Sequence, residues 1–519
     1  MDRDEAWLIE RHKLLALTEE LTAKVSALEA QLRVAELTSE KYQAIIARLK
    51  RMQFGHSSER HVGQFMLDLD TPGPMEETAP IPAVANDDDT KAHPVRRPLP
   101  EHLPREIVRH APPGTDGGCR CAGCGGALHV IGEDTSEVLD FVPASFRVIR
   151  HVRPRLGCRR CETVVQAPAP SIHIERGRPG PGLLAKVLVA KYLDHTPLYR
   201  QARIYARAGV DIDRGTMVGW VGKSAWLLKP LAERIQDHVF KAAAVNTDDT
   251  PLPVLAPGHG KTLTGRMWIY LRDGRPHGDT APPAVAFFYS PDRKGTRPAL
   301  HLKGFQGYLQ ADAYAGYGRI YEAGRIVEVG CWAHARRKIY DVLESTQSPV
   351  AAEALAFVKE LYQIEGRIRG QSPDERHRVR QAESAPLLDR FHAWIVERRA
   401  KLPPRGSLSL ALGYALGQWA ALVRYTTDGR LEIDNNRAEN VLRGIALGRK
   451  NYLFAGSDTG GESAAIVCTL IETARLNGIE PFVYLRDVLG RIADHPINRL
   501  DELLPWTWAA RQDEAVNAA

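Results

Sequence analysis

Two pairs of cysteines with the spacing Cys-x-x-Cys constrain the fold of this chain more than any other feature. One pair lies in CRCAGCGG, residues 119–126, and the other in CRRC, residues 158–161. Two thiolates in such a turn can bind one ion, and a second turn completes a tetrahedral set of four sulfur ligands for zinc. The natural ligand set is Cys121, Cys124, Cys158 and Cys161, which leaves Cys119 as a spare.

The residues between the two pairs favour a small β structure around the ion. They include EVLDFVPASFRVIRHVRPRLG, residues 137–157, which alternates between apolar and polar positions as a β-hairpin does. Four thiolates leave no open position for a substrate, so the metal is expected to be structural. We therefore predict a zinc ribbon over residues 106–170 that holds a structural Zn²⁺.

The length of the chain requires more than one core, because 519 residues exceed what a single core normally holds. The net charge of +6 favours an anionic partner only where basic residues cluster. No run of eighteen apolar residues occurs, and the N-terminus MDRDEAWLIERHK is charged from its second residue. We therefore expect no membrane span, no secretory signal and a cytoplasmic location.

Apolar residues follow a heptad repeat from about residue 8 to residue 50, without an intervening Gly or Pro. The d positions are Leu14, Leu21, Leu28, Ala35, Tyr42 and Leu49, and the apolar a positions are Val25, Leu32 and Ile46. This pattern predicts a coiled coil within residues 1–60 that joins copies of the chain. A single amphipathic helix packed on the body is the alternative. The proline-rich residues 61–105 are expected to form a linker.

The stretch from residue 183 to residue 228 has helical patterning throughout. Within residues 171–240 it contains a helix, a short turn with Gly209 and a second helix, with Asp213 as a candidate N-cap. This is the outline of a helix-turn-helix, and a surface helix pair with scattered arginines is the alternative. The candidate phosphate-binding residues are Arg200, Arg203, Arg207, Arg214 and Lys223.

Short apolar runs separated by turn signals predict five strands after residue 243, with helices following the last of them. The runs are residues 243–255, 266–273, 284–290, 307–314 and 325–332. This order suits an α/β sheet. Asp248 and Asp249 are expected to end the first strand and Asp312 the fourth, so that both strands present a carboxylate at one edge of the sheet.

A third acid is available in DNNRAENVLRG, residues 434–444, where Glu439 has Asn436 and Arg443 on its helical face. Phosphoryl transfer uses carboxylates that hold two Mg²⁺ ions about 3.5–4 Å apart. Asp434 is a competing carboxylate, although its position with Asn435 is more typical of a helix start. Each acid taken alone is better explained as a turn, cap or surface residue.

Basic residues near these acids favour reading them together as a site for phosphate chemistry. The segment CWAHARRKI, residues 331–339, carries His334, Arg336, Arg337 and Lys338, and LGRKN, residues 447–451, adds Arg449 and Lys450. We predict that these residues and Arg443 contact DNA.

These motifs together resemble those of bacterial transposases of the insertion sequence 66 family, a branch of the DDE transposases. The resemblance extends from the leucine-rich N-terminal helix and FGHSSER, through the paired cysteines, to the C-terminal segments. TDDT with Asp248, DAYAGY with Asp312 and DNNRAE with Glu439 resemble the three catalytic elements, and CWAHARRK is also similar. Asp249 stands where the family usually has Glu, and CRCAGC leaves Cys119 as a possible substitute for Cys121.

The resemblance implies a multidomain α/β protein with an RNase H-like catalytic domain over residues 241–480. It also implies an all-helical insertion at about residues 341–430, whose sequence is helix-like, and a helical tail over residues 481–519. Asp248, Asp312 and Glu439 would be the catalytic acids that bind Mg²⁺ or Mn²⁺ in a two-metal site.

The implied activity is DNA transposition in the nucleoid of a bacterium. The protein would bind terminal inverted repeats, free a 3′ end in a Mg²⁺-dependent cleavage and transfer that end into target DNA. A dimer formed through the coiled coil would hold two ends, and accessory proteins encoded by the element are possible partners. The alternatives are a DNA-binding regulator or inactive transposase, and an RNase H-like nuclease.

Overall fold

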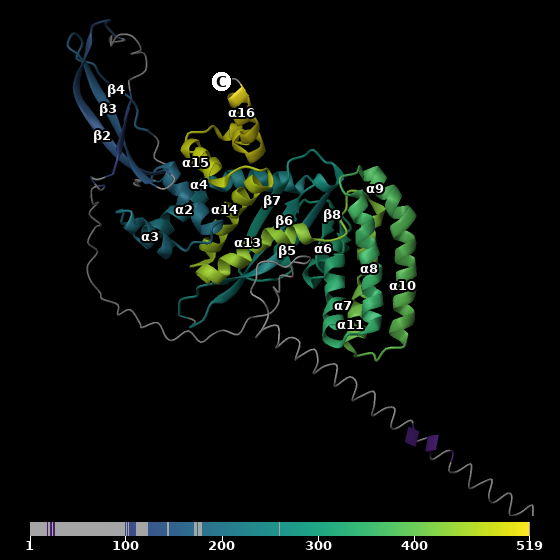
Figure 1. The fold of residues 1–519 in the computed structure, drawn as a ribbon. Helices are drawn as coiled ribbons and strands as arrows, with labels where there is room; N and C mark the ends of the chain where they lie inside the picture. The colour runs from purple at the N-terminus through teal and green to yellow at the C-terminus, as the bar shows by residue number, and fades with distance from the viewer. Residues whose placement is uncertain are drawn as a thin grey trace, which may run out of the picture.

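The structure is a computed structural model that describes most of the chain beyond residue 99 (Figure 1). The described residues are 18, 21, 22, 24, 25, 99, 101, 103–110, 123–142, 145–170, 174, 179–258 and 260–517. Most of the predicted coiled coil and linker, together with Cys119 and Cys121, lies outside them. Within the described ranges, no helix combines the length and the apolar run that crossing a membrane requires.

Four strands form the region that holds the cysteines: β1 (Arg105–Arg109), β2 (Leu128–Val142), β3 (Ser145–Cys158) and β4 (Val164–Gln166). β2 and β3 pair antiparallel along their whole length, β1 adds in parallel to β3, and β4 pairs with the far end of β3. The predicted hairpin within residues 137–157 is therefore confirmed. The long hairpin projects from the body of the protein (Figure 1).

Three helices follow: α2 (Pro181–Tyr192), α3 (Leu198–Arg207) and α4 (Arg214–Phe240). The predicted helix-turn-helix outline corresponds to α3 and α4. In the turn between them Gly209 adopts φ +76°, and Asp213 caps α4 by accepting the Thr216 N–H at 3.2 Å. The prediction of continuous helix from residue 183 is wrong at residues 193–197, because Pro197 has no N–H to continue the ladder of α2.

A five-stranded sheet lies at the centre of the body, in the order β7-β6-β5-β8-β9. Its strands are β5 (Ala244–Val254), β6 (Leu263–Arg272), β7 (Ala284–Ser290), β8 (Gly307–Gln310) and β9 (Ile326–Val329). β5, β6 and β7 pair antiparallel, whereas β8 and β9 run parallel to β5. All five predicted strands are confirmed.

One detail of the strand prediction is wrong. Asp248 and Asp249 do not end β5, which continues to Val254 because it remains paired with β6 from Asn246 to Val254. The parallel ladder with β8, however, stops at Asn246. Asp248 therefore lies within a strand but beyond the end of its neighbour.

The connections between the strands contain short elements, and the chain after the acids is helical. The connections hold η1 (Arg275–His277), α5 (Thr296–His301), η2 (Ala315–Tyr317) and α6 (Gly318–Glu322). The C-terminal elements are α13 (Asn436–Tyr452), α14 (Asp458–Leu476), α15 (Pro481–Arg491), η5 (Ile497–Leu503) and α16 (Pro505–Asn517). The helix predicted at residues 461–478 is thus α14.

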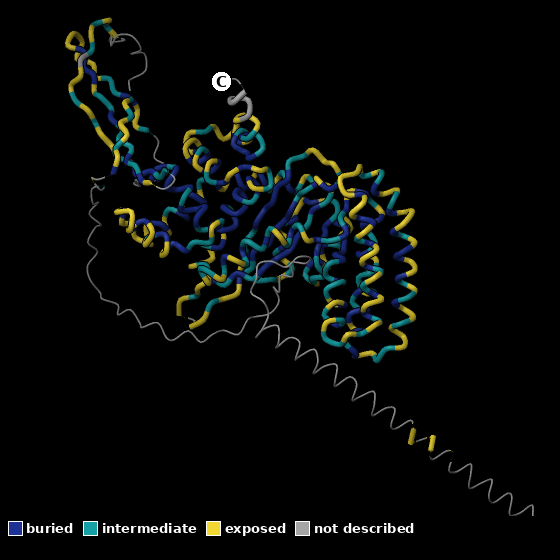
Figure 2. Tube along the Cα trace, viewed as in Figure 1, coloured by how far each residue is buried: buried dark blue, intermediate teal, exposed yellow. Residues whose placement is uncertain are grey.

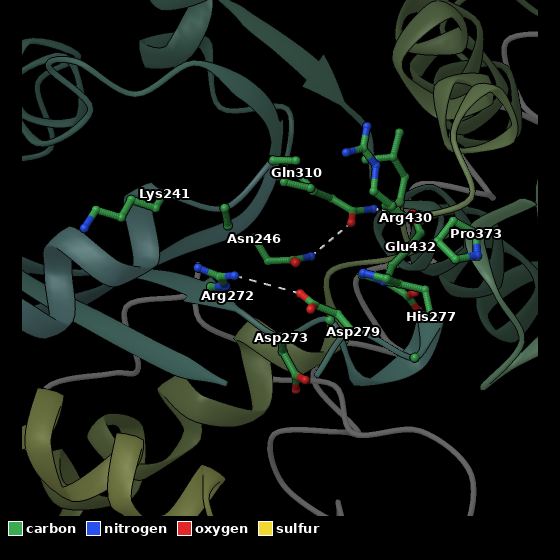
Figure 3. A pocket seen from close by; sticks show the side chains of 16 residues that line it. Lys241, Asn246, Arg272, Asp273, His277, Asp279, Gln310, Pro373, Arg430 and Glu432 are labelled. Carbon is green, nitrogen blue, oxygen red and sulfur yellow. Dashed lines mark hydrogen bonds and ion pairs between the residues drawn. The ribbon is translucent and has the colours of Figure 1, made fainter. Parts of the chain in front are cut away.

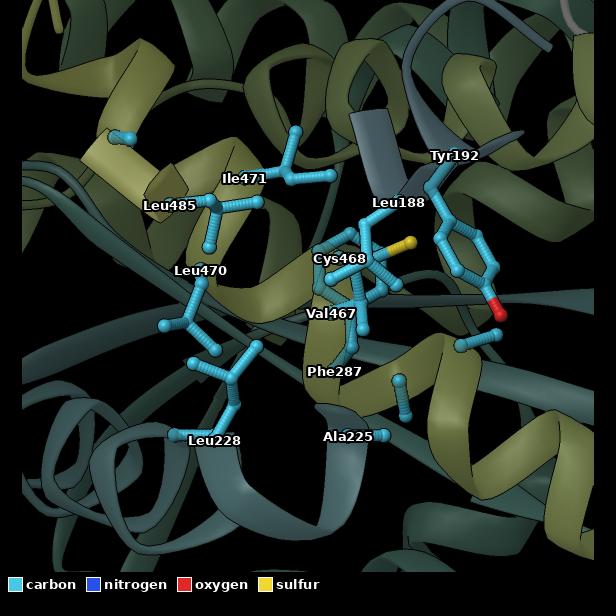
Figure 4. Close-up of a cluster of buried hydrophobic side chains, with 14 of the residues drawn as sticks. Leu188, Tyr192, Ala225, Leu228, Phe287, Val467, Cys468, Leu470, Ile471 and Leu485 are labelled. Carbon is cyan, nitrogen blue, oxygen red and sulfur yellow. The ribbon is translucent and has the colours of Figure 1, made fainter. Parts of the chain in front are cut away.

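The sheet shares one hydrophobic core with helices that precede its strands in the chain and with helices that follow them. Figure 4 shows Leu228 of α4, Phe287 of β7 and Val467 of α14 in the same cluster, with Leu188 of α2 and Leu485 of α15 nearby. α4 and α14 both pack against β7. Because α4 contributes its buried face to this core, the sheet supports the second helix of the helix-turn-helix pair.

Residues 332–427 form a second helical body with its own core. It consists of α7 (Trp332–Thr346), α8 (Pro349–Ile368), α9 (Pro373–Val379), a π-helical turn η3 (Arg380–Ser384), α10 (Ala385–Ala400), α11 (Ser407–Gly417), α12 (Trp419–Val423) and η4 (Arg424–Thr427). Trp332, Phe391 and Leu412 lie at the centre of that core. Each of the long helices has one buried face and one exposed face, so that buried and exposed residues alternate along it (Figure 2). The helices predicted within residues 341–430 are confirmed, and the first of this group begins at Trp332.

A network of buried ion pairs joins helices within this helical body. Glu365 of α8 accepts two hydrogen bonds from the guanidinium of Arg380, at 2.8 and 2.7 Å, and lies 3.5 Å from Arg376. Arg380 also donates to the carbonyls of Tyr425, Asp428 and Leu431. The network therefore ties α8 and η3 to the segment that leads into α13.

We expect Glu365→Gln to destabilise the protein by about 3 kcal/mol, because it leaves the buried guanidinium group of Arg380 without its anion, whereas Arg376 keeps Glu432 at 2.7 Å. Glu360→Gln on the exposed face of the same helix is the matched control and should change stability by less than about 0.5 kcal/mol. Urea unfolding followed by circular dichroism measures both. Equal stability of the two variants would show that the network contributes nothing.

Candidate active site

The register of two parallel strands brings Asp248 and Asp312 to the same level of the sheet. Asn246 and Gln310 form the last pair of the β5–β8 ladder, and each acid follows two residues later in its own chain segment. Side chains two residues apart on a strand point to the same face. The side chains of Asn246 and Gln310 meet in a 3.0 Å hydrogen bond just below this level (Figure 3).

Asn435 fixes the start of α13 beside these acids. Its side chain is fully buried and donates to the carbonyl of Thr247 at 2.8 Å, next to Asp248. Its backbone N–H donates to the sulfur of Cys331 at the start of α7, at 3.3 Å. Glu439 lies one turn further along α13 and is largely buried. One asparagine thus holds the third acid close to the first.

The negative charges of the three carboxylates act on one another. Burial raises the pKa of Asp248 well above its ordinary value, and the negative charges of Asp312 and Glu439 raise it further. Burial also raises the pKa of Glu439, which is opposed by His334 and reinforced by Asp434 and Asp312. A cluster of carboxylates that repel one another suits a divalent cation with a preference for oxygen ligands.

Asp249, the second acid of TDDT, is already paired. Its carboxylate lies 3.1 Å from a guanidinium nitrogen of Arg266 and 2.9 Å from one of Arg293. Arg293 also lies 3.6 Å from Asp312. Neither arginine was among the predicted site residues, although Arg266 is the diagonal cross-strand neighbour of Asp249 on β6. Because both arginines neutralise Asp249, we interpret this acid as a structural residue beside the site and not as one of the metal ligands.

Asp434 caps the start of α13, as its position suggested. Its carboxylate accepts hydrogen bonds from the Tyr362 hydroxyl at 2.8 Å and from the N–H of Asn436 at 3.1 Å. The side-chain amide of Asn436 also donates to Asp434, at 2.8 Å. Asn436 is thus engaged with Asp434, although its spacing placed it on the face of Glu439.

A cleft of about 450 Å³ opens between the sheet and the helical body, beside Asn246 and Gln310 (Figure 3). Charged side chains line it, and several of them form ion pairs. Arg272 lies 3.9 Å from Asp279, which also lines the cleft, and Arg430 lies 2.6 Å from Asp428 outside it. Among the described residues, the two groups of potential metal ligands that lie within 4.8 Å of one another are Cys124, Cys158 and Cys161, and Cys331, His334 and Glu439, and neither group lines this cleft. The second group contains one of the three acids. We therefore place the candidate chemistry at the acids.

Three of the predicted zinc ligands meet at the far end of the β2–β3 hairpin. The sulfur atoms of Cys124, Cys158 and Cys161 all lie within 4.8 Å of one another, and those of Cys124 and Cys158 are 3.4 Å apart. Four sulfurs at about 2.3 Å from one tetrahedral ion have comparable separations. Gly126 packs against them so closely that a Cβ there would lie 3.3 Å from the Cys158 sulfur. These residues fit a structural zinc ion.

Comparison with known families gives four matches along the chain. The profile described as "Transposase IS66 family" matches residues 176–463, more than half of the chain. The chain belongs to this transposase family. An "IS66 C-terminal element" matches residues 469–506, a "zinc-finger binding domain of transposase IS66" matches residues 119–162, and a "Transposase C of IS166 homeodomain" matches residues 41–108.

Similar full-length proteins occur in Sinorhizobium fredii (strain NBRC 101917 / NGR234). The uncharacterized protein y4hP is 42% identical over 435 residues, which cover 81% of this chain and 78% of the relative. The uncharacterized protein y4jD is 39% identical over 492 residues, 91% of this chain and 95% of the relative. The uncharacterized protein y4qI is 38% identical over 507 residues, 94% and 92% respectively. The matched regions mark the chain as an IS66-family transposase with a zinc finger and DNA-binding segments.

The basic residues predicted to contact DNA fall on different parts of this IS66-family chain. Arg203, Arg207 and Arg214 are exposed on α3 and at the start of α4. Arg200, also exposed, donates to the Asn451 side chain at 3.3 Å, which places α3 next to the end of α13 and the exposed Lys450.

The other predicted basic residues are more closely engaged with the protein. Arg336 lies over the ring of Tyr340, and Lys338 lies over that of Tyr414. Arg337 and Arg443 are half-buried. Arg449 is half-buried as well and donates to the Pro251 carbonyl at 2.6 Å, so it supports β5.

Proposed function

We propose that this chain is a DDE transposase that cleaves DNA at the terminal inverted repeats of an insertion sequence and transfers the freed 3′ end into target DNA. The observation that carries the proposal is the placement of Asp248 within β5, of Asp312 two residues after the parallel strand β8, and of Glu439 on α13, with charges that act on one another. Three acids placed in this way, the third far away in sequence, suit the ligand set of a phosphoryl-transfer site.

The topology of the sheet supports an RNase H-like catalytic domain over residues 241–480. Three antiparallel strands continue into two parallel ones, in the order β7-β6-β5-β8-β9. The first acid lies on the central strand and the second follows its parallel neighbour. The helices between β9 and α13 are the proposed insertion, and α14 packs mainly against the edge strand β7.

In this mechanism Asp248, Asp312 and Glu439 would hold two Mg²⁺ or Mn²⁺ ions. These ions would activate the attacking oxygen and stabilise the leaving oxygen of each phosphodiester exchange. The hydrogen bond from the Asn435 side chain to the Thr247 carbonyl ties the start of α13, and with it Glu439, to the strand that bears Asp248. Arg293 holds Asp249 away from the metal ligands and places positive charge beside Asp312, where a scissile phosphate would lie.

The remaining parts of the chain would bring DNA to this site. The zinc ribbon over residues 106–170 and the helix-turn-helix region over residues 171–240 are the proposed binding elements for the terminal repeats. In the segment proposed to form the coiled coil, Leu21 and Val25 are helical and more than half exposed. A second copy covering these side chains would hold two DNA ends together. The proposed domain boundaries also include the coiled-coil unit at residues 1–60, the linker at residues 61–105 and the C-terminal helical tail at residues 481–519.

We expect Arg203→Ala and Arg207→Ala each to weaken DNA binding and to lower the slope of log affinity against log salt by about 1, because each removes one phosphate contact. Fluorescence anisotropy with a terminal-repeat duplex at several salt concentrations measures this slope. Arg390→Ala on the exposed face of α10 is the matched control and should leave the slope unchanged. An unchanged slope in both α3 variants would remove this helix from the interface.

The proposal is tested by incubating the purified full-length protein with Mg²⁺ and a duplex that ends in the inverted repeat of the flanking DNA. The expected products are a free 3′-hydroxyl at the repeat end and its covalent joining to a second duplex. Specific binding without cleavage would support a regulator or inactive transposase instead. Cleavage without joining under all conditions would favour an RNase H-like nuclease.

A further inference from the structure

His334 lies in the first turn of α7, and its imidazole is directed towards Glu439. The Nδ1 atom is 3.6 Å from Oε1 of Glu439, which is too long for a hydrogen bond. That nitrogen is also buried and has no hydrogen-bond partner among the described residues. A buried imidazole nitrogen normally has a partner, so its orientation towards a carboxylate requires an explanation.

We propose that His334 is a fourth ligand of the metal site, which binds the same ion as Glu439 through Nδ1. This inference rests on the proposed function and extends it, because it adds one nitrogen to a set of three acids. Two adjacent ligand atoms at about 2.1 Å from one octahedral ion lie roughly 3.0 Å apart. The observed separation of 3.6 Å is larger, so the imidazole and the carboxylate would have to move closer together when the ion binds.

The position of His334 is fixed by the same contact that fixes Glu439. Cys331 begins α7, and its sulfur accepts the N–H of Asn435, which begins α13. The two helix starts are therefore joined, and one turn along each helix brings His334 and Glu439 face to face. Cys331, His334 and Glu439 form one of the clusters of potential metal ligands in the described residues.

Cys331, His334 and Glu439 offer different ligand atoms, and we assign them different roles for that reason. Mg²⁺ and Mn²⁺ prefer oxygen ligands, imidazole nitrogen is better matched to transition metals, and thiolate is a ligand for soft ions. The sulfur of Cys331 is engaged with Asn435, so Cys331 joins the helices and His334 binds the ion. A nitrogen ligand raises the affinity for Mn²⁺ more than the affinity for Mg²⁺.

The experiment measures Mn²⁺ binding to the full-length, zinc-loaded protein by electron paramagnetic resonance, without DNA and without any activity assay. We expect His334→Ala to weaken Mn²⁺ binding at least tenfold and to weaken Mg²⁺ binding less, as measured by competition. We also expect ¹⁴N modulation of the bound Mn²⁺ signal in the wild type, and its loss in His334→Ala. A purely structural histidine would produce no such nitrogen signal.

Three reference variants make the outcomes distinguishable. Glu344→Gln, further along α7 and exposed, controls for changes in helix and charge and should retain the nitrogen signal. Asp312→Asn and Glu439→Gln should weaken Mn²⁺ binding. If they do, while His334→Ala binds Mn²⁺ as tightly as the wild type and the wild type itself shows no nitrogen modulation, the role of His334 is overturned and the proposed function stands. If neither acid variant affects Mn²⁺ binding, the proposed metal site itself fails.

Discussion

Asp312→Asn is expected to lower cleavage and strand transfer by on the order of 10³-fold, since it removes a ligand of the ions that stabilise the transition state. Glu439→Gln and Asp248→Asn are expected to have similar effects. Each replacement keeps the shape of the side chain and removes its charge. Single-turnover cleavage of a labelled terminal-repeat duplex with Mg²⁺ measures the loss.

Unfolding is not expected to contribute to that loss. Burial and the two neighbouring carboxylates raise the pKa of Asp248, so the negative charges destabilise the protein when no cation is bound. The amide variants should therefore be at least as stable as the wild type in thermal unfolding without Mg²⁺. Asp389→Asn, an exposed acid on α10, is the matched control and should cleave normally. Wild-type cleavage by Asp312→Asn or Glu439→Gln would remove that residue from the metal site.

Loss of zinc is expected to unfold the outer end of the β2–β3 hairpin. Binding of a structural zinc ion contributes about 10 kcal/mol to the folding of small zinc domains, and this part of the hairpin has few other contacts. Its inner end is held differently, because Leu139, Phe146 and Val148 belong to the core of the body. Cys158→Ser should therefore release zinc and remove amide-exchange protection from the outer halves of β2 and β3, while β5 to β9 stay protected.

The fourth zinc ligand can be assigned with the two cysteines that precede Cys124. Cys121→Ser is expected to lose zinc, as measured by metal analysis of the dialysed protein. Cys119→Ser is the matched control and should retain about one zinc ion per chain. The opposite result would show that Cys119 completes the site in place of Cys121. Retention of zinc by Cys158→Ser would contradict the assignment of the cluster.

Local patterns were sufficient to predict the secondary structure that surrounds the site. The five strands of the sheet are short apolar runs between turn signals, and each of them occurs where the pattern placed it. The N-cap of α4 and the start of α13 also followed from local sequence, because a capping side chain bonds to backbone only two or three residues away. The extent of β5 did not, since pairing with β6 continues the strand past Asp249.

Contacts between distant segments were beyond such patterns. Arg293 gives no local signal of its bond to Asp249, because it lies in the connection after β7 and reaches the acid only across the folded sheet. Asn435 was expected only to start a helix, but its side chain spans to Thr247. Arg449 was expected to contact DNA, whereas packing of α13 on β5 directs it to a backbone carbonyl.

The groups that can do chemistry were evident from the residues alone: paired cysteines at metal-ligand spacing, two acids near strand ends and one acid on a helix. They were evident because residue type and spacing along one element are local properties. Which of these groups lie near one another depends on how the elements pack. The parallel register of β5 and β8 brings Asp248 level with Asp312. Asn435 bonds to Thr247 and to Cys331, and these two contacts place the starts of α13 and α7, with Glu439 and His334, beside the sheet. Those distances depend on packing between elements, which no local pattern encodes.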